Sequence, residues 1–314
     1  MTPAYLDHLS FELGDVRQTL AEAKAKGQLI SDPAALAEAG FAEHCVSSTN
    51  SYELAHASVE KIADHLQTVD VIIYSTCLPH NASLPGQAEF DASGDVKHLM
   101  NFPASHLQTD FGMTGARVIG LTQQACTGMI GSIALAQDLI TASAHNQRIL
   151  CVTADRFPDG ALYEQAYNLI SDGAAACLVS TQPSGFRIVS HYHLTNGGMV
   201  KASDDETVGS FFSFAHQVVK EAIDRAELSI EDIDWIVPQN TNTKAWEILT
   251  RLLGIDMSRV FLKSMASAGH IISGDNIVNL KTLVDERLVE PGQRLLLFMA
   301  GYGSNWQAMV VERI

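Results

Sequence analysis

The sequence lacks a run of about 18 consecutive apolar residues, which is the length that a helix needs to cross a lipid bilayer. It also begins with acidic residues where a secretory signal peptide would have a basic segment and an apolar core. These two absences predict a cytoplasmic protein that has no membrane partner.

Basic residues are scarce, because 20 Lys and Arg stand against 36 Asp and Glu, a formal net charge of −16. A surface with this excess of negative charge repels nucleic acids and anionic lipids. We therefore expect no nucleic-acid partner. The same charge disfavours docking to acidic carrier proteins, unless a local basic patch is present.

The five cysteines contain no CxxC pair, and their number is odd. A disulfide framework or a structural zinc site would need paired or clustered cysteines. We therefore expect free thiols in a reducing compartment and no bound metal. The positions are Cys45, Cys77, Cys126, Cys151 and Cys177.

The chain of 314 residues, 46% of them hydrophobic, is long enough for one large domain or for two fused halves. Each half shows an apolar strand, a turn of small residues, a helix and another strand, which predicts halves at 1–170 and 171–314. Cys126 and His270 occupy equivalent positions, each at the start of the central helix of its half. Alternating strands and helices predict mostly parallel sheets that are covered by helices.

Three further segments carry local signals. Residues 16–26 have the apolar spacing of a helix, and Ser31, Asp32 and Pro33 are typical of a helix cap and first turn. Residues 79–103 are polar and are interrupted by Gly and Pro. We expect a long loop there, and long ordered loops are usually functional.

Cys126 lies where a polar turn becomes a helix rich in small residues. Unpaired backbone N–H groups at a helix start favour an anion, so we expect the pKa of this thiol to fall and its nucleophilicity to rise. Gly128 and Gly131 let other backbone approach the first turn closely. The alternative is a buried structural cysteine, since free Cys is among the most buried residue types.

Five stretches of the chain carry a family resemblance. They are QQACTGMIGSIAL around Cys126, SDGAAACL at 171–178, DWIVPQNTN at 234–242, GHIISGD at 269–275 and AGYGSNWQ at 300–307. Together they resemble the motifs of the thiolase-fold condensing enzymes, and within these of the ketoacyl carrier-protein synthase III group. The resemblance implies an α/β thiolase fold, in which two pseudo-symmetric βαβαβαββ halves form an αβαβα five-layer sandwich.

The departures from this family carry information about the reaction. The synthases use Cys, His and Asn, but here the His position holds Gln239, the Asn position holds His270, and a later Ser position holds Asp275. A carboxylate that accepts one imidazole N–H orients the ring as a base. This pairing requires His270 to lie in the turn before the helix, because five helical residues turn through about 140°. The alternative for His270 is a core histidine. The alternative for Asp275 is a carboxylate at a helix start, where the helix dipole favours negative charge.

The resemblance and its departures together predict an acyltransferase with a Cys126, His270 and Asp275 triad. Cys126 would attack an acyl thioester, and the backbone N–H groups of Cys126 and Tyr302 would hold the oxyanion. His270 would then activate a small-molecule hydroxyl or amine, which gives an ester or an amide. Relatives in natural-product biosynthesis carry the same replacement and act as O-acyltransferases. No cofactor is expected beyond the acyl thioester.

Three alternatives remain open from the sequence. The first is a carbon–carbon condensing enzyme of the synthase III type, in which His270 stabilises a carbanion. The second is a non-catalytic partner in a heterodimer, which the intact Cys126 disfavours. The third is a thioester hydrolase in which water replaces the acceptor.

The family resemblance also has implications for the acyl donor and for the oligomeric state. The Trp and Arg that bind coenzyme A in the family are replaced near Ala34 and Glu38, which favours an acyl carrier protein over coenzyme A as donor. Lys244 resembles, by its position in a helix-start motif, a second Arg of the family. The family also implies a homodimer in which a Phe-Pro, here Phe102-Pro103, closes the partner's acyl tunnel; the alternative is an ordinary core Phe. We expect Gln239, Asn242, Lys244 and Phe102 to contact substrate.

Overall fold

The computed structural model describes residues 2–314 except 79–85, 101, 166–167, 202–203 and 303. Its main sheet has nine strands in the order β11-β12-β13-β10-β1-β9-β6-β4-β5. The strands are β1 (Tyr5–Leu13), β4 (Val71–Ser75), β5 (Arg117–Leu121), β6 (Arg148–Asp155), β9 (Gly173–Ser180), β10 (Phe186–Thr195), β11 (Trp235–Val237), β12 (Arg294–Gly301) and β13 (Asn305–Arg313).

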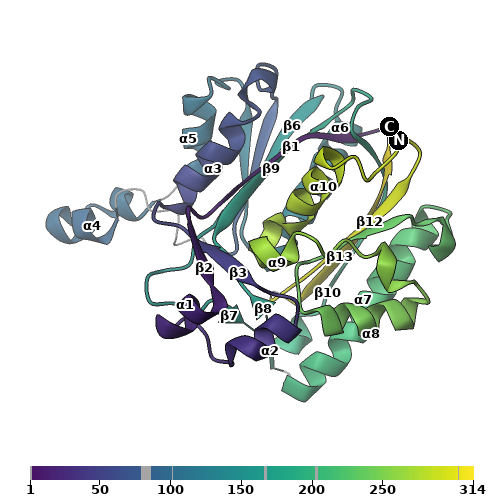
Figure 1. The fold of residues 1–314 in the computed structure, drawn as a ribbon. Coiled ribbons are helices and arrows are strands. Elements are labelled where there is room, and N and C mark those ends of the chain that lie inside the picture. The colour runs from purple at the N-terminus through teal and green to yellow at the C-terminus, as the bar shows by residue number, and fades with distance from the viewer. Residues whose placement is uncertain (1, 79–85, 101, 166–167, 202–203, 303) are drawn as a thin grey trace.

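Strand β1 divides this sheet into two halves. It pairs with β9 from Tyr5 to Leu13, whereas its pairing with β10 covers only Tyr5 and Leu6. On one side of β1 lie β9, β6, β4 and β5, and on the other lie β10, β13, β12 and β11. Figure 1 shows the two halves meeting at this strand.

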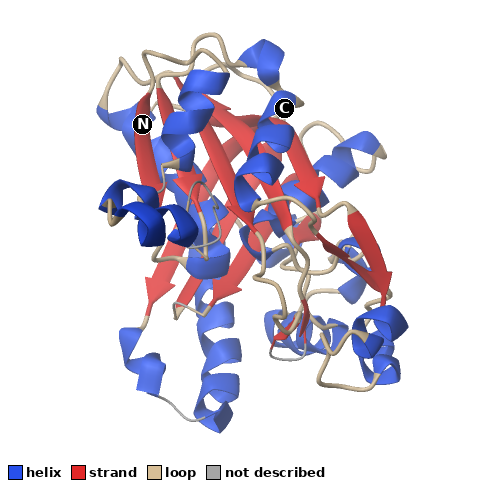
Figure 2. Ribbon diagram, turned by 90° about the vertical axis from the view of Figure 1, so that its left-hand side faces the viewer, coloured by secondary structure: helices blue, strands red, loops and turns tan. Residues whose placement is uncertain are grey.

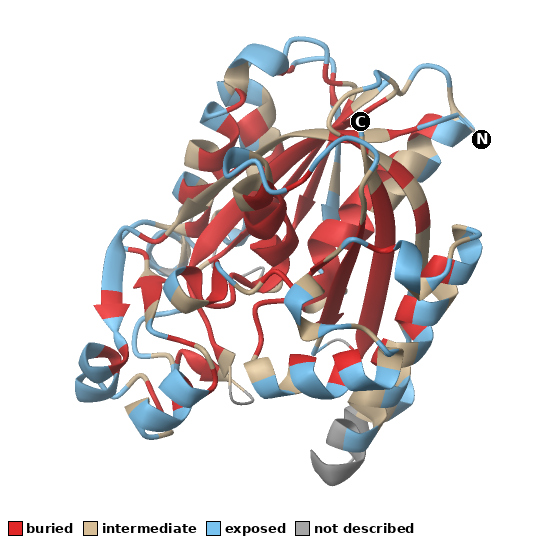
Figure 3. Cartoon of the chain, turned by 45° about the vertical axis from the view of Figure 1, so that its right-hand side comes forward, coloured by how far each residue is buried: buried red, intermediate tan, exposed pale blue. Residues whose placement is uncertain are grey.

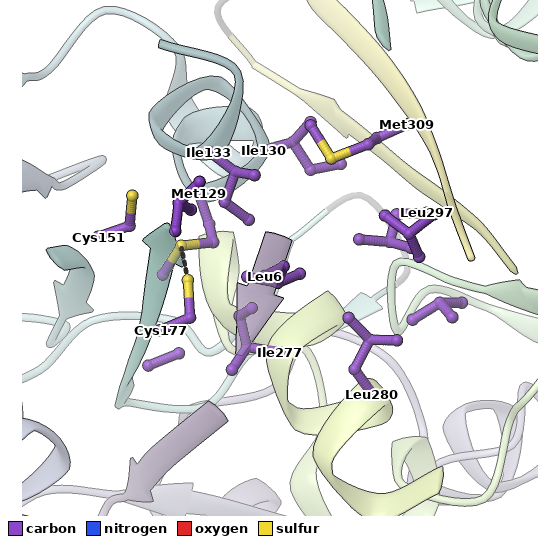
Figure 4. Packing of buried hydrophobic residues seen from close by; sticks show 14 of the residues in the cluster. Leu6, Met129, Ile130, Ile133, Cys151, Cys177, Ile277, Leu280, Leu297 and Met309 are labelled. Carbon is purple, nitrogen blue, oxygen red and sulfur yellow. Dashed lines mark hydrogen bonds between the residues drawn. The ribbon is translucent and has the colours of Figure 1, made fainter. Parts of the chain in front are cut away.

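Two central helices, α6 (Gly128–Ala142) and α10 (Asp275–Asp285), lie between the half-sheets. Their apolar side chains share one core with residues of both half-sheets, as Figure 4 shows for Met129, Ile277 and Leu297. Removing so much apolar surface from water stabilises the pairing of the halves, at roughly 25 cal/mol per Å² buried. The starts of both helices are therefore held by this buried central layer.

The outer faces of the half-sheets carry the remaining long helices. Helices α3 (Ser51–Glu60) and α5 (Pro103–Asp110) cover the half that contains β4, and α7 (Asp204–Arg225) and α8 (Thr243–Leu253) cover the half that contains β12. Figure 2 shows the strands sandwiched between helices, and Figure 3 shows that much of the central sheet is buried. The result is the five-layer αβαβα arrangement that the sequence predicts.

The prediction of mostly parallel sheets is wrong. Strand β4 runs parallel to β5 and β6, and β11 runs parallel to β12, but every other pairing in this sheet is antiparallel within the residues that the structure describes. The reason is that some neighbours are joined without a crossover helix. A short turn after Gly301, for example, makes β12 and β13 a hairpin, which is necessarily antiparallel.

Two local predictions also need correction. Residues 16–26 do not form one helix, because β2 (Val16–Thr19) pairs with β3 (Glu43–Val46) before α1 (Leu20–Ala25) begins. Thr19 ends the strand and starts the helix through a capping box with Glu22. In the described part of 79–103, α4 (Gln87–Ser93) and a 3-10 turn (Val96–Leu99) replace the expected loop, whereas 79–85 and 101 lie outside the described residues.

Other local predictions are confirmed. Asp32 accepts the N–H of Ala34 and caps α2 (Pro33–Glu38), with Pro33 in the first turn. All five residues of β4 are buried, because this strand is covered on both faces. The predicted boundary after residue 170 precedes β9, which pairs with β1 and β6, so the chain changes half-sheets between β9 and β10. The division into two domains itself stays a prediction.

One window, Ala125–Ala142, reaches the length and hydropathy of a membrane span, and 56% of it is buried inside the fold. It consists of α6 and the turn that precedes it. Its position between the half-sheets is typical of the core helix of a compact fold.

Candidate active site

Cys126 lies in a 3-10 turn, Ala125–Thr127, that leads directly into α6. Its side chain is buried, with a residual exposure of 7%. Ala125 has a backbone φ of 45°, in the left-handed region that residues other than glycine rarely adopt. Such backbone strain concentrates at functional sites, where the surrounding structure enforces it.

The second half repeats this geometry. Ile272, with φ of 53°, lies three residues before the start of α10, just as Ala125 lies three residues before the start of α6. The hydroxyl of Ser273 donates to the carbonyl of Ala125 at 2.8 Å and ties the two turns together. The structure therefore brings both helix starts to one centre, as the pseudo-symmetry predicts.

His270 and Asp275 are in direct contact across their turn. His270 Nδ1 lies 2.5 Å from Asp275 Oδ2, and both side chains are almost completely buried. The histidine follows α9 (Met265–Ala268) and precedes α10, which begins at Asp275. The pairing therefore has the geometry that the sequence required, with the histidine in the turn rather than on the helix.

Backbone donors hold the Asp275 carboxylate from two sides. Its Oδ2 accepts the N–H of Asn240 at 2.7 Å, and its Oδ1 accepts the N–H of Ile271 at 2.8 Å. Both oxygens of Asp275 therefore act as hydrogen-bond acceptors in this site. Nδ1 of His270 is then the donor in the contact with Asp275. Asn240 is itself fixed by Asn279, whose amide donates to its Oδ1 at 2.9 Å.

Gln239 completes the surroundings of the imidazole. Its Nε2 lies 3.3 Å from His270 Nε2, and its Oε1 accepts the N–H of Ala300 at 3.0 Å. The indole N–H of Trp246 donates to the carbonyl of Gln239 at 3.0 Å and fixes the backbone of that residue. The expected substrate contact of Gln239 is thus a contact with the histidine in the resting site.

Gly301 explains how closely the end of β12 approaches the cysteine. A Cβ placed on Gly301 would lie 2.9 Å from the backbone N of Cys126 and 3.1 Å from Cβ of Ala125. Only glycine fits this approach without a shift of the backbone. Tyr302 follows at once, with an exposed side chain, so its backbone lies beside the turn of Cys126.

The expectation of a lowered pKa at Cys126 is wrong for the resting site. A hydrogen bond with the side chain of Cys77 raises the pKa of the Cys126 thiol, followed by burial and by the negative charges of Asp275 and Asp155. These effects outweigh the helix start, because the site is buried and the two carboxylates add negative charge near the sulfur. Burial also raises the pKa of Asp155 to about 6.

The other three predicted substrate contacts are found in a helix cap, on an exposed helix turn and at a surface cavity. Asn242 caps α8, because its side chain accepts the N–H of Lys244 at 2.9 Å. Lys244 is exposed in the first turn of the same helix. Phe102 lines a small surface cavity with Tyr74 and Val118, and its side chain is 57% exposed, which excludes the alternative of an ordinary core Phe.

Cys77, Asn240, Ser273 and Gly301 escaped the sequence analysis. One signal was available for Cys77. It comes two residues after β4, and β4 runs parallel to β5, whose end leads to Cys126. The carboxyl ends of adjacent parallel strands lie at one edge of a sheet, so this rule could have placed the two thiols near each other. The other three depend on contacts between distant segments.

Two family models match the chain. The model described as 3-oxoacyl-[acyl-carrier-protein] synthase III matches residues 122–197, and its C-terminal counterpart matches residues 223–313. Together they span more than half of the sequence. The first match includes Cys126, and the second includes Gln239, His270 and Asp275.

Individual proteins agree with these models. The beta-ketoacyl-[acyl-carrier-protein] synthase III of Chlamydia caviae is 24% identical over 319 residues, covering 90% of this chain and 89% of the relative. The crystal structure of the corresponding synthase III of Aquifex aeolicus matches with a TM-score of 0.82 at 16% identity, covering 98% and 99% of the two chains. The acyltransferase ChlB3 matches with a TM-score of 0.81 at 17% identity, covering 99% and 98%. At these identities the solved structures establish the thiolase-type fold alone.

Proposed function

The chain belongs to the 3-oxoacyl-[acyl-carrier-protein] synthase III family of condensing enzymes, and from this premise we propose that it is an acyltransferase that forms esters or amides. An acyl group passes from a carrier-protein or coenzyme A thioester through Cys126 to the hydroxyl or amine of a small molecule. The observation that carries the proposal is the 2.5 Å contact between His270 Nδ1 and Asp275 Oδ2.

This contact prepares His270 to act as a base. With Nδ1 donating to Asp275, the lone pair of the neutral ring is on Nε2. Because the pKa of the Cys126 thiol is raised, little thiolate forms at neutral pH, and attack requires a base that takes the thiol proton. His270 is the base that the site offers to Cys126 as well as to the acceptor.

The first half-reaction loads the enzyme. Sγ of Cys126 forms a bond to the thioester carbonyl carbon while its proton passes to His270 Nε2. The carbonyl electron pair moves to oxygen, where the backbone N–H groups of Cys126 and Tyr302 stabilise it. Collapse of the tetrahedral intermediate breaks the bond to the carrier sulfur, which leaves with the proton from His270.

The second half-reaction unloads it. The acceptor oxygen or nitrogen attacks the acyl carbon while His270 Nε2 takes its proton, and Asp275 stabilises the imidazolium through Nδ1. Collapse breaks the carbon–sulfur bond, and the Cys126 thiolate regains the proton. The number of protons is unchanged over the cycle, and the products are an ester or amide and a free carrier thiol.

The replacement of the family's His by Gln239 supports transfer over condensation. Condensation draws a carbanion from a decarboxylating malonyl thioester, and a neutral amide stabilises the enolate less than a charge-assisted donor does. The fold is shared with ChlB3, a structure described as an acyltransferase, which is consistent with transfer, and we include a role in natural-product biosynthesis in the proposal. The relatives named synthase III keep carbon–carbon condensation as the second candidate.

Carbon dioxide release separates the two candidates. Purified protein is given a malonyl thioester and a panel of hydroxyl and amine acceptors, and product mass and carbon dioxide are measured together. We expect products that keep the carboxylate, and equal success with simple acyl donors. Carbon dioxide released one for one with product would instead establish the condensing enzyme.

Single-turnover loading tests the roles of the side chains. We expect His270→Ala to form the Cys126 acyl-enzyme slowly and to fail in passing it on, as seen by intact-protein mass. Asp275→Asn keeps the base but loses its orientation, so transfer falls less completely. Full turnover by His270→Ala would remove the triad from the proposal, and absence of any adduct in the native protein would favour a non-catalytic partner.

We further propose a homodimer in the cytoplasm and an acyl carrier protein as the donor. The support for the dimer is the exposed Phe102 beside β5, an edge strand of the sheet whose Val118 is also exposed. The support for the carrier protein is the absence of the family's Trp and Arg near Ala34 and Glu38. Pantetheine would reach Cys126 from either donor.

A further inference from the structure

We propose that Gln239 is a positioning residue that sets the tautomer of His270, by donating its amide N–H to His270 Nε2 and so keeping the ring proton on Nδ1. The inference rests on the proposed function, because the tautomer matters only if His270 is a base. It concerns a side chain that would otherwise be read as a passive replacement of the family's histidine.

The orientation of the Gln239 amide follows from its other contact. Its Oε1 accepts the backbone N–H of Ala300 at 3.0 Å. A flipped amide would place an NH₂ group against that N–H, which leaves two donors facing each other. The amide nitrogen therefore points to His270 Nε2, at 3.3 Å.

The two neighbours of the imidazole then impose one state on it. Asp275 is an acceptor that holds the proton on Nδ1, and Gln239 is a donor that requires the lone pair on Nε2. A doubly protonated ring would place Nε2–H against the amide N–H, so Gln239 disfavours the imidazolium in the resting site. An incoming hydroxyl that donates to Nε2 replaces the amide contact without a change of tautomer.

The charges around the imidazole come from several elements. Asp275 at the start of α10 faces Nδ1, and Cys126 lies across the joined turns, with Asp155 of β6 acting on its thiol. His44 of β3 packs near Gly269, and burial lowers its pKa, so it adds no charge at neutral pH. With the thiol also neutral, the Asp275 carboxylate favours the imidazolium from contact distance, and the Gln239 amide opposes it.

The decisive variant is Gln239→Glu. Glutamate has the shape of glutamine and keeps an acceptor for the N–H of Ala300, but it replaces the amide donor with a carboxylate oxygen. That oxygen accepts from a protonated Nε2, so both ring nitrogens hold protons and the pKa of His270 rises. Acyl transfer at pH 7 then falls about tenfold for each unit by which this pKa exceeds the pH of the assay.

The readout is the titration of His270 by ¹⁵N NMR in protein with labelled histidine, with the signals identified by their loss in His270→Ala. We expect the native signal to show a proton on Nδ1 alone at neutral pH, and the Gln239→Glu signal to show protons on both nitrogens over a wider pH range. The rate of transfer from the loaded enzyme is measured over the same pH series, and its rise should move to higher pH in the variant.

Gln239→Met is the matched control for a purely structural role, because it removes both side-chain hydrogen bonds at similar length. If Gln239 acts on the tautomer, loss of its donor in Gln239→Met lets the doubly protonated ring persist to higher pH, whereas a native His270 titration in Gln239→Met shows that Gln239 only anchors Ala300 and overturns the proposal. A native signal with the proton on Nε2 overturns it as well. The titration is read without turnover, so carbon dioxide release in the earlier experiment would refute the acyltransferase and leave this result standing.

Discussion

At the scale of single residues, the thiol of Cys126 is kept protonated by its surroundings. Cys77 contributes the largest effect through a hydrogen bond, and burial and two carboxylates add to it. A thiol of this kind is protected from oxidation and alkylation, since both proceed through the thiolate. It reacts when a base is placed beside it, which makes the reactivity of the cysteine depend on His270.

The pH dependence of Cys126 alkylation tests the effect of Cys77. Removing the hydrogen bond in Cys77→Ala lowers the pKa of Cys126, so alkylation with iodoacetamide becomes faster at pH 7–8 and its rise with pH begins earlier. Peptide mass spectrometry identifies Cys126 as the modified site. Cys77→Ser keeps a hydrogen-bonding group and should lie closer to the native profile. An unchanged profile in Cys77→Ala would show that burial and the two carboxylates are enough to keep the Cys126 thiol protonated.

At the scale of elements, the site depends on how tightly the end of β12 packs on the turn that carries Cys126. The contact partner at Gly301 is backbone, which cannot swing away as a long side chain does. The strained φ of Ala125 lies in the same turn. The position of the cysteine is therefore set by a strand from the other half of the molecule.

Gly301→Ala tests this packing. The new Cβ would lie 2.9 Å from the backbone N of Cys126, so the turn must shift. A displacement of about 1 Å near reacting groups costs roughly 10²-fold in rate, and we expect acyl loading to fall by about that factor. Loading is followed by intact mass and the fold by circular dichroism. Gly115→Ala is the control, because nothing lies within 4 Å of its Cβ. Equal loading by both variants would refute the constraint.

At the scale of the whole molecule, β5 is one of the two edge strands of the sheet, with β11 at the other end. Its burial pattern contrasts with the fully buried β4 beside it, and Phe102 and Val118 expose large apolar side chains along a shared cavity. Apolar side chains gathered on an edge strand are typical of a contact surface. This is the face that we assign to the homodimer.

Phe102→Ala tests whether this face also shapes the acyl site. Because the side chain is mostly exposed, its loss should leave the stability of the monomer nearly unchanged. If Phe102 closes the partner's tunnel, the variant accepts longer or bulkier acyl chains, measured by competition among thioesters of different length. Light scattering establishes that native protein and variant are compared as dimers. The same chain-length preference in both would remove Phe102 from the site.

The amino-acid sequence by itself determined where the chemistry is placed along the chain. Strands, turns and helix starts depend on nearby residues, so the positions of Cys126, His270 and Asp275 relative to their helices followed from local patterns and from the family motifs. The layered fold followed as well, because each half must bury its apolar faces. Residues 16–19 were misread because pairing with β3, a distant segment, decided their structure.

Only the tertiary structure decided how the site is tuned. The hydrogen bond of Cys77 with Cys126, the orientation of Gln239 by Ala300 and the approach of Gly301 each join segments far apart in the chain. The direction of the sheet strands and the exposure of Phe102 also depend on how distant segments are arranged in space. A pKa depends on charges, burial and donors within a few ångströms in space, and a local sequence pattern does not contain those neighbours.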